Sequence, residues 1–338
     1  MRVQYASMNI IEFEETLVNW RFEKYYHPKI DIIGEGFRPV SGSVADFCVT
    51  QLDGTYHFFY IERRLAEGTP FYPGNEIYFG HASTPDFFTW EVHDPVMLIQ
   101  PGTWEEAHVW APFILKRGAT YVMAYTGLNR HISQDIGLAF SEDLFEWRRW
   151  EGNPISPCKD RPWSFWRTDG IASCRDPHML EYKGRVWMTY TTNTHDGRAC
   201  VAMTSSEDLV TWRDHGPILV GPEGGYEPVF AGGHKQASEE STNLQHRNGK
   251  WYLIVNTAMR HTPIRHWIIE SDRIDSFSFD SGWEFWPDGG CTEVVKDRGD
   301  RSLMAAVGGG RIIFGEVDWS AERPTVTRVS NAEQLKAW

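Results

Sequence analysis

The 338-residue chain is predicted to be all-β, a five-bladed β-propeller with a short N-terminal helix. The first reason is a repeat, since turn glycines recur at intervals of 64, 66 and 65 residues, at Gly54, Gly118, Gly184 and Gly249. The second is that each repeat holds about four short strands with period-2 alternation, while helical periodicity is scarce. A constant period of this length is typical of propeller blades, whose radial repetition protects the strand edges.

Each repeat opens with a polar turn followed by an alternating aromatic and aliphatic strand. These segments read DGTYHFFYIE (53–62), RGATYVMAYTG (117–127), KGRVWMTYTTN (183–193) and NGKWYLIVNT (248–257). A second motif follows in phase as HASTPDFFTW, AFSEDLFEW and MTSSEDLVTW, with a weaker copy, ESDRIDSFSF. Residues 291–317 form a degenerate fifth unit. The pattern predicts five blades of four strands each.

Only one segment has a helical pattern. Residues 9–26, NIIEFEETLVNWRFEKYY, place apolar side chains on a fair but imperfect stripe. We therefore expect a helical extension over residues 1–34 and a single propeller domain over residues 35–338.

Composition excludes some classes of function. The net charge of −13 gives no basic surface for nucleic acid, and no apolar run approaches the length of a membrane span. No secretory signal is visible, and five cysteines without metal-ligand spacing suggest free thiols in a reducing compartment. These features predict a cytoplasmic protein with no cofactor, no metal, and no nucleic-acid or membrane partner. The 16 tryptophans are enough for a large core and a binding cleft.

Acidic residues recur near the start of the strand that precedes each turn glycine. Asp46 and Asp176 lie eight residues before Gly54 and Gly184, Trp110 lies eight before Gly118, and Glu240 lies nine before Gly249. In a propeller the innermost strands surround the axis, so these side chains are expected to converge at the mouth of the channel. A structural Asp–Arg pair between blades would explain Asp176 alone, but three acids in phase favour a functional site.

Carboxylates around a pocket rich in tryptophan suit glycoside hydrolysis. One acid must be protonated to assist the leaving oxygen, while another must be ionised to act as base or nucleophile. A third negative charge nearby raises the pKa of the acid, because like charges disfavour joint ionisation.

At these residues the sequence resembles the five-bladed propeller glycosidases of glycoside hydrolase family 43 and the fructosidase families 32 and 68. The likeness covers roughly residues 35–320 and rests on VADFCVTQLDGTYHFFY, HVWAPFILKRGATYVMAY, CRDPHMLEYKGRVWMTY and EESTNLQHRNGKWYL. The tripeptide at residues 175–177 is similar to the fructosidase RDP motif. The chain departs from the fructosidase opening WMNDPNG, and Glu240 is followed by Ser-Thr rather than Gly-Pro or Cys-Pro.

The resemblance implies roles for four residues. Asp46 would be the general base of an inverting enzyme or the nucleophile of a retaining one. Asp176 would orient the substrate and tune the acid, Glu240 would be the general acid, and Arg175 would hold furanose hydroxyls. We expect inversion, since the register and the lack of a C-terminal sandwich match family 43 better. Glu239 and Glu227 are rivals of Glu240, but neither keeps the register.

Further candidates are less specific. Trp110 is favoured for stacking on a sugar, while Trp163 and Trp166 suit a subsite wall and a hydrophobic plug between blades equally well. Phe71 lies in a turn-rich insertion that could narrow the pocket. His178, two residues after Asp176, shares its face and is placed among the substrate-binding residues.

The sequence thus predicts a hydrolase of terminal furanosides, either fructofuranosides or arabinofuranosides, whose partner is an oligosaccharide or glycoside. One alternative is a non-catalytic carbohydrate-binding propeller, which would not need a proton donor. Another is a propeller phosphorylase acting on mannosides, for which Arg130-His131 and Arg260-His261 would supply the phosphate site.

Overall fold

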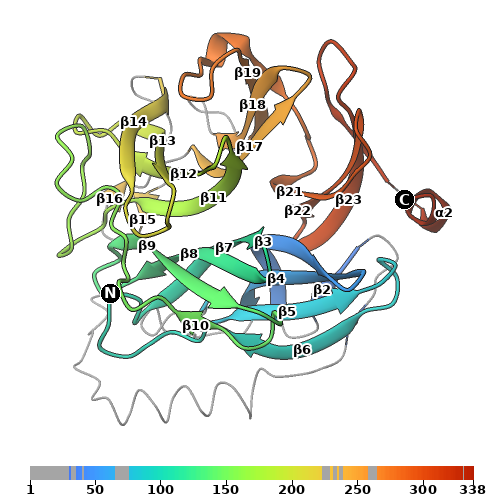
Figure 1. Cartoon of the computed structure of the whole chain (residues 1–338), viewed down its shortest axis with the longest axis horizontal. Coiled ribbons are helices and arrows are strands. Elements are labelled where there is room, and N and C mark those ends of the chain that lie inside the picture. The colour runs from blue at the N-terminus through green and yellow to red at the C-terminus, as the bar shows by residue number, and fades with distance from the viewer. Residues whose placement is uncertain are drawn as a thin grey trace.

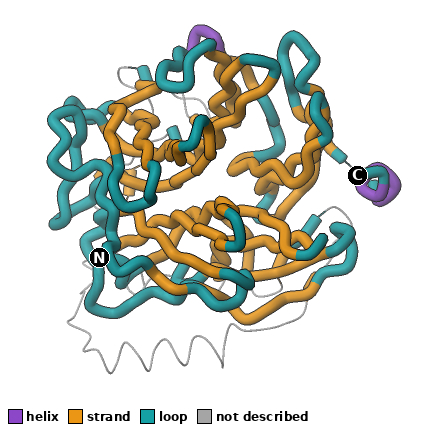
Figure 2. Tube along the Cα trace, viewed as in Figure 1, coloured by secondary structure: helices purple, strands orange, loops and turns teal. Residues whose placement is uncertain are grey.

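A computed structural model describes residues 30–31, 36–39, 42–64, 76–222, 229–230, 234–235, 239–257, 265–329 and 331–338. Within these residues, five antiparallel sheets of four strands surround a central axis, which confirms the predicted propeller (Figure 1). Figure 2 shows that strands and loops make up nearly all of the described ring. In the described residues, helix is confined to a 3₁₀ turn and one short α-helix near the C-terminus. The helix predicted for residues 9–26 lies outside the described residues.

The blades follow one another along the chain, and each is a meander whose strands pair in sequence order. Blade 1 comprises β3 (Gly42–Leu52), β4 (Thr55–Arg64), β5 (Phe79–Thr84) and β6 (Glu91–Val96). Blade 2 comprises β7 (His108–Arg117), β8 (Thr120–Leu128), β9 (Gln134–Ser141) and β10 (Arg148–Arg149). Blade 3 comprises β11 (Cys174–Tyr182), β12 (Arg185–Asn193), β13 (Ala199–Ser206) and β14 (Arg213–Val220).

The last two blades have the same order. Blade 4 comprises β17 (Glu240–Arg247), β18 (Lys250–Thr257), β19 (Arg265–Ser271) and β20 (Gly282–Glu284). Blade 5 comprises β21 (Gly290–Asp297), β22 (Arg301–Gly308), β23 (Arg311–Asp318) and β24 (Val326–Arg328). The remaining short elements are β1 (Ile30–Asp31), β2 (Arg38–Pro39), β15 (Val229–Phe230), β16 (His234–Lys235), a 3₁₀ turn (Phe279–Ser281) and α2 (Ala332–Lys336). Among these described elements, no helix has the length and apolar character needed to cross a membrane.

The first strand of every blade lies at the axis. β3, β7, β11 and β17 each contact the first strand of the following blade, and β21 contacts β3, so the ring closes. One hydrophobic cluster fills the space between each pair of neighbouring blades in the described chain. Burial of these apolar faces between sheets is the main force that holds the blades together.

The second repeated motif forms a turn that satisfies its own backbone. In blade 3 the hydroxyl of Ser206 accepts a hydrogen bond from the N–H of Leu209 at 2.8 Å. Asp208 accepts two further backbone N–H bonds, which lower its pKa to about 2. The indole of Trp212 donates to the carbonyl of Leu209 at 3.2 Å. Blades 1 and 2 repeat these contacts, which explains why a hydroxyl residue, an aspartate and a tryptophan recur at fixed spacing.

The segment before blade 1 joins the last blade to the first. The N–H of Phe37 donates to the carbonyl of Ile312 at 3.0 Å, and the N–H of Ile312 donates back at 2.8 Å. The Phe37 ring is fully buried and stacks on Trp90 of blade 1 with ring centroids 4.5 Å apart. Backbone and core contacts therefore both close the ring.

Candidate active site

The first strands of all five blades line one pocket, whose empty space, including the part open to solvent, is about 300 Å³. Its lining residues are Asp46, Phe47, Ala111, Pro112, Asp176, Pro177, Ser241, Thr242, Cys291, Thr292 and Glu293. Each strand places in the lining the residue that lies six positions before its own end, namely Asp46, Ala111, Asp176, Ser241 and Cys291. The pocket is thus built from one position repeated around the axis.

A β-bulge turns each of these positions toward the pocket. The pairing register shifts beside the repeated position in all five blades. In four of them the residue itself has a left-handed φ, 44° at Ala111, 56° at Asp176, 53° at Ser241 and 52° at Cys291. Left-handed backbone is costly for residues other than glycine, and bulges of this kind commonly re-aim side chains at functional sites.

The sequence register was off by one residue in two blades. The structural equivalents of Asp46 and Asp176 are Ala111 and Ser241, so Trp110 and Glu240 each lie one position earlier. In blade 2 the glycine is the first residue of the turn, since Arg117 pairs with Thr120, whereas in the other three blades it is the second. Counting back from the glycine therefore gave Trp110 instead of Ala111.

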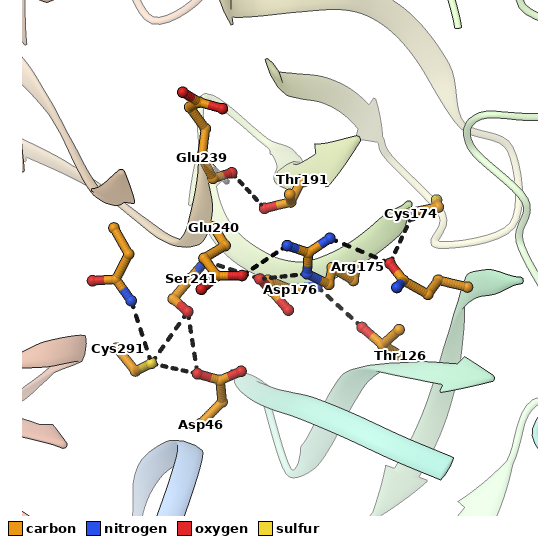
Figure 3. Close-up of polar contacts among 12 residues, drawn as sticks. Asp46, Thr126, Cys174, Arg175, Asp176, Thr191, Glu239, Glu240, Ser241 and Cys291 are labelled. Carbon is orange, nitrogen blue, oxygen red and sulfur yellow. Dashed lines mark hydrogen bonds and ion pairs between the residues drawn. The ribbon is translucent and has the colours of Figure 1, made fainter. Parts of the chain in front are cut away.

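Arg175 links two of the predicted acids (Figure 3). Its guanidinium donates to Oε2 of Glu240 at 2.7 Å and lies 3.4 Å from Oδ2 of Asp176. Gln134 accepts a further bond from it at 3.4 Å. The side chain of Arg175 is only 2% exposed, so the charges of this network meet where solvent screens them little. Asp176 lines the pocket, and Arg175, which lies outside the lining, connects it to Glu240.

Ser241 and Cys291 donate hydrogen bonds to the third predicted acid, Asp46. The Ser241 hydroxyl donates to Oδ1 of Asp46 at 3.1 Å, and the Cys291 thiol donates to the same oxygen. The N–H of Ser241 also donates to Oδ2 of Asp176 at 2.9 Å. Among the described residues no partner contacts Oδ2 of Asp46, which leaves that oxygen available to a ligand.

Burial dominates the electrostatics of the site. It raises the pKa of Asp176 to about 7, with Arg175 opposing the shift and the charges of Asp46 and Glu240 adding to it. It also raises the pKa of Glu240, against the lowering effect of the Arg175 ion pair. Raised carboxyl pKa values are what a group needs in order to carry a proton near neutral pH.

Three functional residues of the pocket, Ser241, Cys291 and Glu293, were missed by the sequence reasoning. Cys291 is the fifth copy of the repeated position, and burial raises the pKa of its thiol, which therefore stays protonated and donates. Glu293 is a third carboxyl group in the pocket lining, beside those of Asp46 and Asp176, whereas Glu240 lies outside the lining. Burial, followed by the charge of Asp46, raises the pKa of Glu293 well above the usual value. A signal existed, because Cys291 lies eight residues before Gly299, but the repeat is shortened to 50 residues there.

The aromatic candidates lie elsewhere. Trp163 donates to Asp214 of β14 at 2.9 Å and Trp166 donates to the carbonyl of Gln134 at 2.8 Å, and both pack against the core between blades 2 and 3. Neither lines the pocket, so the structure favours the plug over the subsite wall. Trp110 packs against His108 with ring centroids 5.3 Å apart, also outside the pocket lining, and its stacking role stays a prediction.

His178 and Glu239 also lie outside the pocket lining. His178 is buried against Phe113 and accepts a bond from the N–H of Leu244 at 3.4 Å, and burial lowers its pKa to about 3. It therefore lies beneath the pocket rather than in its lining. Glu239 is buried and accepts a bond from Thr257 at 3.2 Å, so its carboxylate points away from the acids (Figure 3). Phe71 and Glu227 lie outside the described residues.

Comparison with solved structures shows the same fold in known glycosidases. A GH32 β-fructofuranosidase of Bombyx mori has a TM-score of 0.65 and 17% sequence identity, over 94% of this chain and 69% of that one. For the sucrose-6-phosphate hydrolase of Lactobacillus gasseri the values are 0.67 and 14%, over 96% and 68%. A thermostable family-43 glycoside hydrolase gives 0.60 and 14%, over 86% and 96%.

Comparison of the sequence with family models identifies the family of the chain. No curated protein matches the sequence significantly. The family model described as "Glycosyl hydrolases family 32 N-terminal domain" matches residues 47–227, which is 181 of the 338 residues. This range contains the strands that carry Arg175 and Asp176. The chain therefore belongs to glycosyl hydrolase family 32, through that family's N-terminal domain, and is a glycoside hydrolase.

Proposed function

We propose that this glycoside hydrolase cleaves terminal furanosides, with fructofuranosides or arabinofuranosides as its substrate class. The observation that carries the proposal is the network in which Arg175 and Ser241 connect Asp46, Asp176 and Glu240 beside one pocket. Structures with this fold include a β-fructofuranosidase bound to sucrose and an α-L-arabinanase, which act on furanosides by name.

The three carboxyl groups have separate roles in this proposal. Glu240 is the general acid that protonates the leaving oxygen, since burial raises its pKa and Oε1 is not engaged by Arg175. Asp46 acts at the anomeric carbon through Oδ2, while Ser241 and Cys291 fix Oδ1. Asp176, with Arg175, binds sugar hydroxyl groups and adjusts the charge beside Glu240.

The fate of the anomeric configuration decides the role of Asp46. A base that activates water gives inversion, and a nucleophile that forms a covalent intermediate gives retention. The prediction of inversion was based on the closer likeness to family 43, and the match to the family 32 model removes that basis. Proton NMR of the anomer released first distinguishes the two roles.

A substrate panel tests the proposed class. The purified protein is assayed on nitrophenyl α- and β-furanosides and pyranosides, and on sucrose and inulin, with Asp46→Asn as the inactive control. We expect release of a terminal furanose sugar from at least one substrate, lost in the control. Turnover of pyranosides alone would overturn the furanoside proposal while leaving the assignment as a glycosidase intact.

A further inference from the structure

Three histidines meet on one face of blade 1, away from the pocket. His57 lies on β4, His81 on β5 and His93 on β6, so each comes from a different, adjacent strand. One ring nitrogen from each lies within 4.8 Å of the other two. Nδ1 of His57 and Nε2 of His81 are 2.9 Å apart, and Ser83 Oγ holds the His93 ring at 2.7 Å from Nε2.

The cluster is buried beneath an aromatic ring of the next blade. His81 is fully buried, His57 is 4% exposed, and the side chain of His93 is 15% exposed. The Phe145 ring of blade 2 covers all three, with centroid distances of 5.6 Å to His57, 5.0 Å to His81 and 5.1 Å to His93. The three rings are therefore packed together under Phe145, with His93 the most exposed of them.

The same three positions are apolar in blade 2 and mostly apolar in blade 3. The three positions are defined by their distance from the tryptophan that ends each turn motif. His93 lies three residues after this tryptophan, and His81 lies nine residues before it. His57 pairs across the sheet with the residue that lies seven before it. The equivalent residues are Val122, Leu138 and Trp150 in blade 2, and Trp187, Met203 and His215 in blade 3. Blade 3 keeps only the serine–histidine pair, with Ser205 Oγ 2.8 Å from Nε2 of His215. Of the three blades compared, blade 3 has one histidine at these positions, blade 2 has none, and only blade 1 has all three.

Three imidazoles at this place need a reason, because burial of polar groups costs free energy unless they are paired. The His57–His81 contact pairs one nitrogen of each ring, and Nδ1 of His81 has no hydrogen-bond partner. A metal ion that coordinates one nitrogen of each ring would offset part of the free-energy cost of burying the three imidazoles.

We propose that His57, His81 and His93 bind a divalent transition metal, with Zn²⁺ as the best match. Three imidazoles without a carboxylate suit zinc, copper or nickel rather than calcium or magnesium.

The arrangement is close to what zinc requires. Zn–N bonds of about 2.0–2.1 Å in a tetrahedral site place the ligand nitrogens roughly 3.3 Å apart. The observed distances between the ligand nitrogens are 2.9 Å for one pair and at most 4.8 Å for all three, so they lie on both sides of this value. A water molecule completes the coordination. Since none of the three histidines lines the pocket, the metal ties β4, β5 and β6 together and takes no part in hydrolysis.

Metal titration with variants matched to the neighbouring blade tests the site. The full chain is stripped with a chelator and titrated with Zn²⁺ by calorimetry and with Co²⁺ by visible absorption. His81→Met installs the residue that blade 3 has at this position, and His215→Ala removes the lone histidine of blade 3. We expect one site in the wild type and in His215→Ala, bound at least tenfold more weakly by His81→Met. Zinc should also raise the melting temperature of the first two only.

Two results would overturn the proposal. One is a wild-type protein that binds neither ion above the level of His81→Met, which would mean that the trio is a hydrogen-bonded cluster alone. The other is equal binding by all three proteins, which would place the ion elsewhere. If His81→Met does not fold, His93→Ala, at the most exposed of the three positions, must show the same loss.

Discussion

At the scale of residues, the site contains four carboxyl groups whose surroundings differ, three in the pocket lining and that of Glu240 outside it. Arg175 pairs with Glu240 and contacts Asp176, while Ser241 and Cys291 hold Asp46. Glu293 has no side-chain hydrogen-bond or ion-pair partner among the described residues, and its pKa is raised well above the ordinary value. These differences decide which groups are neutral and which are charged when a sugar enters.

Glu293 should tolerate a neutral replacement. Because burial and the charge of Asp46 favour the protonated form of this carboxyl group, Glu293→Gln should retain kcat/KM within about threefold at pH 6–7. Glu240→Gln, in contrast, should lose a factor of about 10²–10⁴, the usual contribution of a general acid. Steady-state rates of both variants on one substrate check this. A loss in Glu293→Gln as large as that in Glu240→Gln would identify Glu293 as the acid.

Asp176 should make the stability of the fold depend on pH. Its pKa is about 7 in the folded state, against about 3.9 in an unfolded chain. The folded state therefore binds the proton more tightly, and its stability is fully present below about pH 4 and falls as pH rises through 7. Asp176→Asn should remove a fall of about 1–4 kcal/mol between pH 5 and pH 8. Denaturant unfolding across this range measures the slope, and equal slopes in the two proteins would contradict the assignment.

At the scale of elements, the repeated bulge both shapes the pocket and stores strain. Ala111 adopts a φ of 44°, which glycine tolerates and alanine does not favour. Ala111→Gly should therefore be neutral or stabilise the fold by up to about 1 kcal/mol. Ala124→Gly, at a buried position of regular strand β8, should destabilise by about 1 kcal/mol. Free energies of unfolding of both variants decide, and a destabilised Ala111→Gly protein would show that the bulge carries no such strain.

The elements could be predicted from the sequence because each blade contains its own signals. Alternation marks the hairpins, and the hydroxyl, aspartate and tryptophan of the turn motif satisfy local backbone groups. The exact register could not be predicted, since a two-residue turn accepts glycine at either place, as Gly118 and Gly184 show. Cys291 and Glu293 were missed because the fifth unit has a shortened period and no tryptophan at the end of a turn motif.

The contacts between side chains also could not be predicted from the sequence pattern. Arg175 and Asp176 were both assigned to the site, but their joint contact with Glu240 depends on how blades 3 and 4 meet at the axis. Trp163 and Trp166 were ambiguous for the same reason, because an apolar loop beside a strand fits a pocket wall and an inter-blade core equally well.

At the scale of the whole molecule, the ring is held by contacts between its ends. Phe37 is fully buried between blades 5 and 1, and its backbone pairs with Ile312. Phe37→Ala should cost about 3–5 kcal/mol, as expected for removal of a buried aromatic ring. Phe165→Ala, at a position 46% exposed, should cost under about 1 kcal/mol. Equal free energies of unfolding for the two variants would mean that the closure contributes little to stability.

The structure has all five cysteines as free thiols, four of them buried. The cytoplasmic location that the sequence suggested stays a prediction.

The separate catalytic roles proposed for Asp46 and Glu240 are tested most directly by varying the leaving group of the substrate. The rate of each variant, Asp46→Asn and Glu240→Gln, is measured on the natural sugar and on a dinitrophenyl furanoside, whose leaving group needs no protonation. We expect Glu240→Gln to lose several orders of magnitude on the natural sugar and to recover most of its rate on the dinitrophenyl substrate. Asp46→Asn should stay inactive on both, because the group that acts at the anomeric carbon is gone. Full activity of Glu240→Gln on the natural sugar would contradict this assignment and move the general acid to another carboxyl group of the pocket.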